Sequence, residues 1–385
     1  MNRFYFDHNA TTPVSPEVLE ALEPVLREVY GNASSIHYYG QAAKQRLEAA
    51  RRQVAALIRA EPQEIVLLSG GTEADNLAIL GTARNSPRAG RHVITTTIEH
   101  PAVLGSCAQL EREGVAVTYV RVGSDGVVAP EDVRRALRPE TVLVSVMHAN
   151  NELGTLQPIA QIARLAHEAG AVFHSDGVQA LGKVPVDTAG LGVDLYSMSG
   201  HKIYAPKGVG ALYVRQGTPL APILFGGRHE RGRRAGTQNV AGAVALGRAA
   251  EWLREHFEAE AARVRALRDR LEQEILGRVP AVAVNGRNAP RTPNTASIRF
   301  EGIDGEAMVI ALDLLGFAVS GGAACSSGAP EPSHVLTAIG LPPDQARATI
   351  RFSLGRSNTV EQVDALIQAV AEAAVHLRRV STTHV

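Results

Sequence analysis

The sequence predicts an α/β protein with a mainly parallel sheet, followed by a smaller α+β domain. Between residues 64 and 214, short apolar runs alternate with helical segments, a pattern typical of strands joined by helices on a parallel sheet. A long helical stretch over 241–276 follows, and short strand-like runs and helices come after it. We therefore expect a large domain over residues 16–260, and a small domain made of residues 1–15 and 261–385.

The composition is that of a folded protein in a reducing compartment. Hydrophobic residues make up 45% of the 385 residues and charged residues 20%, which excludes a disordered chain. Lysine plus arginine and aspartate plus glutamate each number 39, so no net charge attracts nucleic acid or an anionic membrane. Two cysteines, Cys107 and Cys325, are too few for a disulfide framework. The N-terminus does not resemble a signal peptide and no apolar run reaches transmembrane length, so we expect a cytoplasmic protein.

Local signals place the individual elements. Ser15 followed by Pro16 suits the start of a helix, as does Pro101, because proline lacks the amide hydrogen that the first helical turn leaves unpaired. Short, wholly apolar runs are typical of strands buried on both faces. The expected strands are 65–68, 92–97, 115–120, 142–147, 171–176, 194–198, 210–214 and 295–300. The expected helices are 16–30, 41–59, 74–84, 101–113, 241–276, 305–315 and 360–377.

The stretch Ser199-Gly200-His201-Lys202 is the first candidate for chemistry. It follows a predicted strand, so Lys202 lies where that strand has just ended. A lysine held there in a dry cleft would lose solvation, its pKa would fall, and its amine could form a Schiff base. The alternative is an ordinary loop lysine that happens to follow a histidine.

Polar or small residues follow several other predicted strands, where open α/β sheets bind ligands. Gly70-Gly71-Thr72 precedes a helix, and its backbone amides could bind a phosphate, although Gly-Gly also occurs at such turns for geometry alone. His100 follows the next strand, and Asp176 ends a later one with Gln179 one helical turn beyond. Asn151 lies in a polar segment that could equally be a turn and a helix N-cap.

Three features in the second half of the chain also call for an interpretation. Cys325 lies among Gly, Ala and Ser, so we expect it to be a reactive thiol on a mobile loop over about 319–332 rather than a chance surface cysteine. Cys107 lies on a predicted helix and has the pattern of a buried, structural cysteine. Either Arg351 or Arg356 could bind a carboxylate through two hydrogen bonds, and Arg351, on a predicted strand, is the more rigidly placed. The Gly- and Arg-rich segment 226–237 is expected to be irregular, and it favours a phosphate or subunit contact over nucleic acid.

Together these motifs resemble the cysteine desulfurases of the NifS/IscS type, which belong to the class-V aminotransferase-like enzymes of fold type I that use pyridoxal 5'-phosphate (PLP). The matching segments occur in the family's order and run from near the N-terminus to beyond residue 350. They are FDHNATTPV, GNASSIH, SGGTEADNLAI, EHPAVL, HANNELGTLQPI, HSDGVQALGKVPVD, SGHKIYAPKGVGALYV, GGRHERGRRAGTQN, VSGGAACSSGAPEPSHVL and IRFSLGR. The resemblance implies a large PLP-binding domain with a sheet of the seven-stranded type.

The resemblance also implies how PLP would be held. Lys202 would bind it covalently, Asp176 would pair with the ring nitrogen, and Gln179 would donate to the phenolic oxygen. His100 would stack on the ring and move protons. The phosphate would be held by four residues of this chain and one from a second subunit, which implies a homodimer. These are Gly71, Thr72, Ser199 and His201, with Thr237 of the neighbouring subunit.

The substrate and the sulfur transfer follow from the same resemblance. L-cysteine would be bound by Asn151 and by Arg351, which would hold its carboxylate. Cys325 would accept the sulfur as a persulfide while L-cysteine becomes L-alanine. The sulfur would then pass to an acceptor such as an iron–sulfur scaffold protein. No metal is expected. The alternatives are a selenocysteine lyase or another class-V enzyme, and a PLP-binding scaffold without catalysis.

Overall fold

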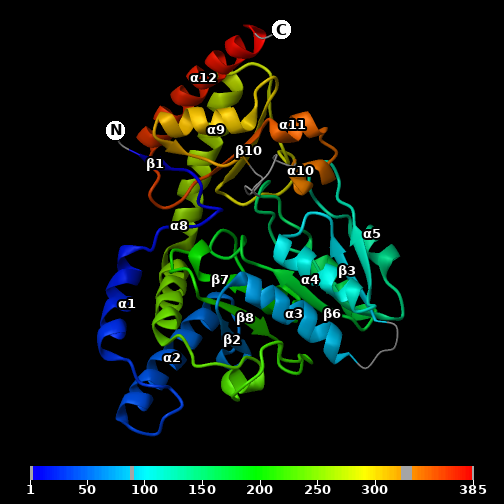
Figure 1. The fold of residues 1–385 in the computed structure, drawn as a ribbon, viewed down its shortest axis with the longest axis vertical. Coiled ribbons are helices and arrows are strands. Elements are labelled where there is room, and N and C mark those ends of the chain that lie inside the picture. The colour runs from blue at the N-terminus through cyan, green and yellow to red at the C-terminus, as the bar shows by residue number, and fades with distance from the viewer. Residues whose placement is uncertain (1–2, 87–90, 322–331, 384–385) are drawn as a thin grey trace.

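A sheet of seven strands forms the centre of the larger part of the molecule (Figure 1). The computed structural model describes residues 3–86, 91–321 and 332–383, with side chains to residue 379. The strand order is β2-β8-β7-β6-β5-β3-β4, in which only β8 runs antiparallel to its neighbours. The strands are β2 (Ile65–Leu68), β3 (His92–Thr96), β4 (Ala116–Val120), β5 (Thr141–Ser145), β6 (Val172–Asp176), β7 (Leu195–Ser199) and β8 (Gly210–Val214). The expected mainly parallel sheet is confirmed.

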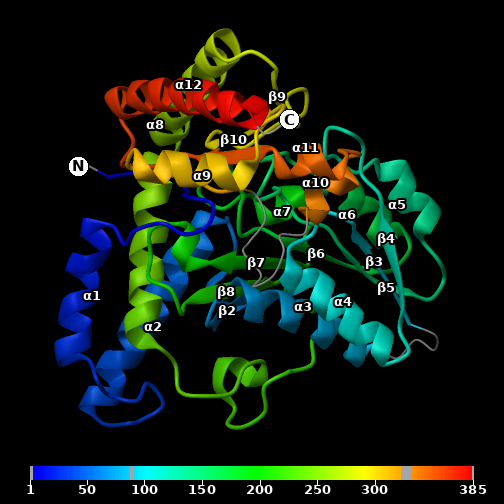
Figure 2. The same cartoon turned by 45° about the horizontal axis from the view of Figure 1, so that its top comes forward.

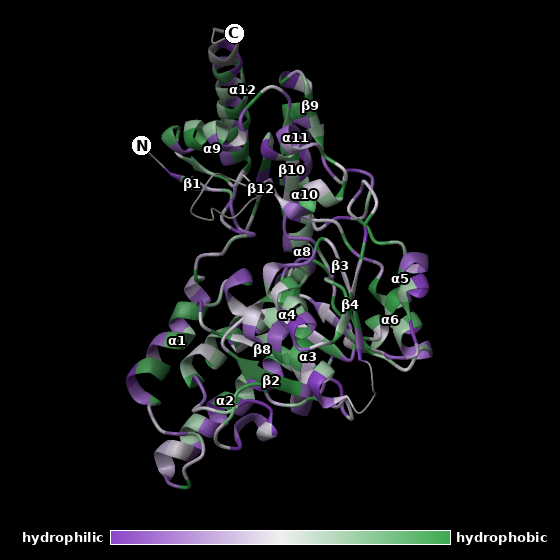
Figure 3. Ribbon diagram, turned by 45° about the vertical axis from the view of Figure 1, so that its right-hand side comes forward, coloured by the Kyte–Doolittle hydropathy of each residue, from purple (hydrophilic) through white to green (hydrophobic). Residues whose placement is uncertain are grey.

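Helices cover both faces of this sheet. On one face α3 (Gly71–Asn85) and α4 (Pro101–Arg112) pack on the strands, and Cys107 is buried in this layer. The opposite face is covered by α1, α2, α5, α6 and the first half of α8 (Figure 2). Because both faces are buried, the strands are apolar over most of their length, as Figure 3 shows for β2. The bounds of the covering helices are α1 (Pro16–Glu28), α2 (Tyr38–Leu57), α5 (Pro130–Ala136), α6 (Ile159–Glu168), the short α7 (Thr188–Leu191) and α8 (Val240–Arg278).

A second hydrophobic core lies beside the first. It joins the C-terminal half of α8 to the antiparallel sheet β12-β10-β9 and to α9 and α12. The N-terminal strand β1 (Phe4–Tyr5) pairs with β11 (Phe317–Ala318) at the same end of the molecule, so the first residues of the chain cross from this core to the large sheet. The remaining elements are β9 (Val282–Val284), β10 (Thr295–Phe300), α9 (Gly305–Leu314), α10 (His334–Ala338), α11 (Pro343–Arg347), β12 (Thr349–Ser353) and α12 (Val360–Thr383).

The elements expected from the sequence agree with the structure to within three residues at their ends, except that α12 continues to Thr383, six residues beyond its expected end. The stretch expected to be helical over 241–276 is one unbroken helix, α8, which extends through both hydrophobic cores. The expected domain boundary at residue 260 lies inside this helix, and the boundary stays a prediction. Segment 226–237 contains only a single turn of 3-10 helix, His229–Gly232, in which Glu230 and Arg231 adopt left-handed backbone angles. No helix within the described ranges is both long and apolar enough to cross a bilayer.

Candidate active site

A cavity of about 490 Å³ opens at the carboxyl ends of the parallel strands. The loops after β6 and β7, the start of α3 and the start of α4 bring their residues into it, and β12 adds one from the second core. This is the edge at which an open α/β sheet binds its ligands. The structure brings ten of the predicted site residues together here: Gly71, Thr72, His100, Asn151, Asp176, Gln179, Ser199, His201, Lys202 and Arg351.

Lys202 ends a short 3-10 turn, Gly200–Lys202, that continues directly from β7. Its Nζ donates to the backbone oxygens of Asn9 and Ala10, at 2.6 and 2.7 Å. Burial, together with the nearby Arg351 guanidinium, lowers the pKa of Lys202 to about 8. At pH 7 roughly a tenth of this amine is therefore uncharged and nucleophilic, far more than for an ordinary loop lysine.

Asp176 is the last residue of β6 and is 5% exposed. Its Oδ1 accepts from the backbone amide of Val178 at 2.9 Å. Burial raises the pKa of Asp176, while the His100 ring and the Lys202 amine act in the opposite direction. A buried carboxylate that faces a cavity is stabilised when a cation binds beside it, and a protonated pyridine nitrogen is such a cation.

The N-terminus of α3 provides an anion site at the same cavity. A Cβ added to Gly71 would lie 2.7 Å from Val178 Cγ2, in the loop after β6, so a larger residue at position 71 would require this valine to move. Ser199, at the end of β7, lies next to this turn. Backbone amides at the start of a long helix, a hydroxyl group and glycines form a typical phosphate cradle. The cradle, the Lys202 amine and the Asp176 carboxylate line one cavity, and together they fit the phosphate, the aldehyde and the ring nitrogen of PLP.

Two histidines of the cavity are uncharged at neutral pH. His100 caps α4, with its Nδ1 accepting from the Ala102 amide at 3.1 Å. Its ring is open to the cavity, yet the surrounding protein desolvates it and lowers its pKa. The His201 ring lies 3.1 Å from Thr11 Oγ1, and burial followed by the Lys202 charge lowers its pKa to about 4. Both rings are therefore neutral, and each can donate one hydrogen bond and accept another.

Arg351 enters the cavity from β12 and is 6% exposed. Its Nη2 donates to Asp7 Oδ1 at 2.7 Å and its Nη1 to the backbone oxygen of Asn151 at 3.1 Å. Its Nε is buried without a hydrogen-bond partner among the described residues. A buried guanidinium group with spare donors suits a carboxylate ligand.

Two predicted residues are not placed in this cavity. Thr237 is exposed and does not line the cavity of its own chain. Cys325 lies outside the residues that the structure describes. Cys107, by contrast, is fully buried, and burial raises the pKa of its thiol to about 12, so it stays an unreactive thiol at neutral pH.

Sequence reasoning missed several polar residues of the site. Asp7 and Asn9 line the cavity although they are far from its other residues in the chain. Asp75 also lines the cavity, and its Oδ1 has no hydrogen-bond partner among the described residues. Lys183 reaches Gln179 from one helical turn further on. The spacing of Gln179 and Lys183 is a usable signal. Asp7 and Asn9 lie in the motif FDHNATTPV, but the motif was not interpreted as part of the cavity.

This fold and cavity define an α/β enzyme with a lysine amine at the end of a sheet strand. The family described as "Aminotransferase class-V" matches residues 4–366, and the chain belongs to this family. A protein named "Cysteine desulfurase" from Nostoc sp. is 48% identical over 381 residues, which cover 99% of this chain and 95% of that protein. The resemblance inferred from the motifs is thereby confirmed.

Solved structures agree with this assignment. One described as "NIFS-LIKE PROTEIN" superimposes with a TM-score of 0.91 at 38% identity, covering 97% of this chain and all of that one (100%). Another, described as "SspA in complex with cysteine", has a TM-score of 0.81 at 37% identity and covers 92% of this chain and 99% of the other. The expected fold class is confirmed by these similarities.

Proposed function

We propose that this protein is a PLP-dependent cysteine desulfurase, which converts L-cysteine to L-alanine and transfers the sulfur to Cys325. One observation carries the proposal: Lys202, Asp176 and Arg351 line a single cavity in a chain that is 48% identical to a cysteine desulfurase. When bound, PLP supplies an electron sink for the carbon that carries the substrate amine.

We assign the binding of PLP to three parts of the cavity. Gly71, Thr72, Ser199 and His201 would hold the phosphate, and Lys202 would bind the aldehyde carbon. Asp176 would pair with the protonated ring nitrogen, a cation that would compensate its buried carboxylate. Gln179 would donate to the phenolic oxygen. The uncharged His100 ring, open to the cavity, would accept the proton of the substrate.

L-cysteine is bound through its carboxylate by Arg351, whose guanidinium group is already oriented by Asp7 and by the Asn151 backbone. Asn151 lies on the same side of the cavity and completes this subsite. In the transfer step the Cys325 thiolate attacks the sulfur of the substrate. A sulfur–sulfur bond forms, the carbon–sulfur bond breaks, and its electron pair returns to the carbon, which is then protonated.

We further propose that the protein acts as a homodimer in the cytoplasm. Thr237 is exposed away from its own cavity, as expected of a residue that reaches the phosphate of a second subunit. Large apolar side chains are exposed elsewhere on the chain, including Ile36 at 94% and Phe225 at 83%, and a subunit interface would cover such side chains. The persulfide is then available to an acceptor protein such as an iron–sulfur scaffold.

The visible spectrum tests the proposal. The purified protein is expected to be yellow with bound PLP, and L-cysteine should change the spectrum and yield alanine. Lys202→Ala should abolish the normal visible band. A colourless wild-type protein that does not bind added PLP would overturn the assignment. Turnover of selenocysteine that survives Cys325→Ala would instead indicate a selenocysteine lyase.

A further inference from the structure

The Asn9 carboxamide is the centre of a hydrogen-bond network between the two cores. Asn9 is 2% exposed and follows the N-terminal strand. Its Oδ1 accepts from Lys183 Nζ at 3.0 Å and from Asn294 Nδ2 at 2.9 Å. Its Nδ2 donates to the Asn151 backbone oxygen at 3.0 Å and to Thr295 Oγ1 at 2.8 Å. With both lone pairs and both amide hydrogens engaged, the orientation of this carboxamide is fixed.

The backbone oxygen of Asn9 faces the catalytic cavity. It accepts from Lys202 Nζ at 2.6 Å and from Gln179 Nε2 at 2.9 Å. The position of the Lys202 amine therefore depends on how Asn9 is held.

Lys183 connects the two carboxamides of this network. Its Nζ donates to Asn9 Oδ1 and, in a very short contact, to Gln179 Oε1. Since the amine binds the oxygen of the Gln179 amide, the nitrogen of that amide must face Asn9 and the cavity.

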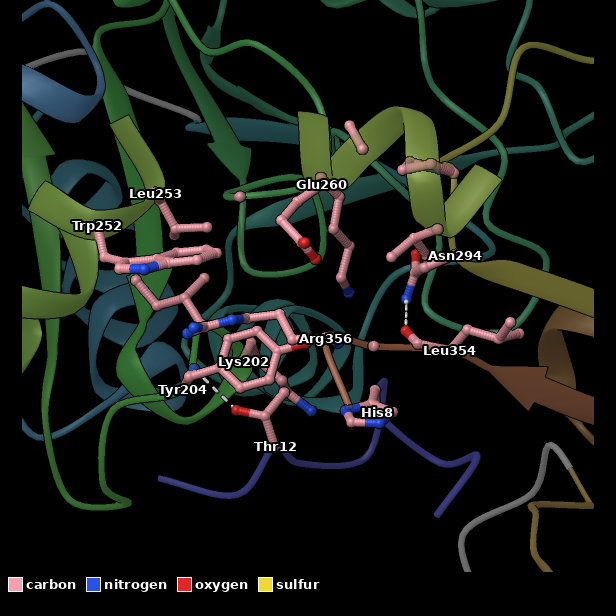
Figure 4. A pocket seen from close by; sticks show the side chains of 17 residues that line it. His8, Thr12, Lys202, Tyr204, Trp252, Leu253, Glu260, Asn294, Leu354 and Arg356 are labelled. Carbon is pink, nitrogen blue, oxygen red and sulfur yellow. Dashed lines mark hydrogen bonds between the residues drawn. The ribbon is translucent and has the colours of Figure 1, made fainter. Parts of the chain in front are cut away.

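Lys202 also lines a second, smaller cavity of about 50 Å³, whose lining side chains Figure 4 shows. Lys183 and Lys202 both line it, together with the rings of Tyr204 and Trp252. Lys202 lines both this cavity and the catalytic one, whereas Lys183 lines only the smaller cavity and contacts residues of the catalytic one through Asn9 and Gln179. At such a place the position of an amine is set by its hydrogen-bond partners and not by bulk water.

We propose that Lys183 is a positioning residue: by binding the oxygens of Asn9 and Gln179 it holds the Asn9 carbonyl against the Lys202 amine and turns the Gln179 amide nitrogen toward the cofactor site. This inference rests on the proposed PLP function of Lys202. If Lys183 were purely structural, its removal would only destabilise the fold. As a positioning residue, its removal should displace the Lys202 amine without unfolding the chain.

Capture of PLP by the PLP-free, full-length chain tests the role. Lys183→Met should slow the appearance of the visible band by about tenfold or more, because a misplaced amine loses its orientation, and should shift the position of that band. The matched control is Lys207→Met, at an exposed position, which should behave as wild type. A folded Lys183→Met protein with the wild-type rate and band would overturn the proposal.

A second measurement does not need the Lys183→Met variant to fold. The chain has only four lysines, at positions 44, 183, 202 and 207, so ¹³Cε-lysine labelling gives few NMR signals. Burial and the Lys202 charge lower the pKa of Lys183, so Lys202→Met should raise it. An unchanged Lys183 titration would show that the two amines do not lie close to each other, and it would overturn the proposed positioning role. If wild type binds no PLP, the proposed function fails, and this titration still decides whether Lys183 lies where it can position the Lys202 amine.

Discussion

Asp7 Oδ1 lies 2.7 Å from Arg351 Nη2 in the wall of the catalytic cavity, so a carboxylate of the chain itself holds the guanidinium group proposed to bind the substrate. This contact orients Arg351, whose side chain is 7% exposed, before the substrate arrives. An oriented guanidinium group can donate two parallel hydrogen bonds to a carboxylate, and a lysine amine cannot.

Arg351→Lys is therefore expected to raise the KM for L-cysteine by about tenfold or more, with a smaller change in kcat. Steady-state kinetics with alanine as the measured product provides the test. Arg347→Lys, at an exposed position of α11, is the control and should leave KM unchanged. A wild-type KM in the Arg351→Lys variant would show that the substrate carboxylate binds elsewhere.

The pH dependence of PLP capture follows from the pKa of Lys202. Only the uncharged amine reacts, and burial with the Arg351 charge brings its pKa down from 10.5 to about 8. The capture rate of the PLP-free protein should rise with pH, with a midpoint near 8, and then level off. Arg351→Met removes one cause of the lowering, so its midpoint should be higher. A wild-type midpoint near that of free lysine would contradict the assignment.

Mixing two impaired variants tests whether Thr237 contributes to the PLP site of the neighbouring subunit. Thr237→Ala should weaken both PLP sites of its dimer, and Lys202→Ala should inactivate both of its own. In a mixed dimer, one cavity has Lys202 from one chain and Thr237 from the other, so the mixture should recover part of the lost activity after subunit exchange. Absence of recovery, with mixed dimers demonstrated by native mass spectrometry, would place Thr237 outside the neighbouring site.

The segment that carries Thr237 is held by a buried ion pair. Two Arg51 nitrogens, Nη1 and Nη2, contact Glu230, at 2.6 and 2.9 Å, and the two side chains are 4% and 1% exposed. Glu230→Gln leaves the guanidinium charge buried and should lower the free energy of unfolding by about 3 kcal/mol. Urea denaturation measures this.

Glu48→Gln is the matched control for that ion pair. Glu48 also contacts Arg51, at 3.3 Å, but its side chain is 37% exposed. Its loss should lower the free energy of unfolding by less than about 1 kcal/mol. Equal effects of the two substitutions would show that burial does not decide the strength of these pairs.

The parts of the site that lie at strand ends could be predicted from the sequence. Gly71, His100, Asp176 and Lys202 each follow an apolar run, and the carboxyl ends of parallel strands meet at one edge. The family resemblance added their roles and the order of the motifs. Arg351 was correctly expected on a strand, although its approach to the cavity depends on how the second core packs.

The remaining polar contacts could not be predicted because they join segments far apart in the chain. Asn9 contacts Lys183, Asn294 and Thr295, and no local pattern specifies such partners. The orientation of β8, antiparallel within a mainly parallel sheet, likewise depends on the path of the chain after Lys202 and not on the composition of the strand.

The mass of the peptide that carries Cys325, measured after a single addition of L-cysteine without reductant, tests the central proposal most directly. The account predicts a peptide heavier by one sulfur atom, formed together with an equivalent amount of alanine. Cys325→Ser should remain yellow and form neither, while Cys107→Ser should react as wild type. Alanine formed at the wild-type rate with an unmodified Cys325, or in the Cys325→Ser variant, would contradict sulfur transfer to this residue.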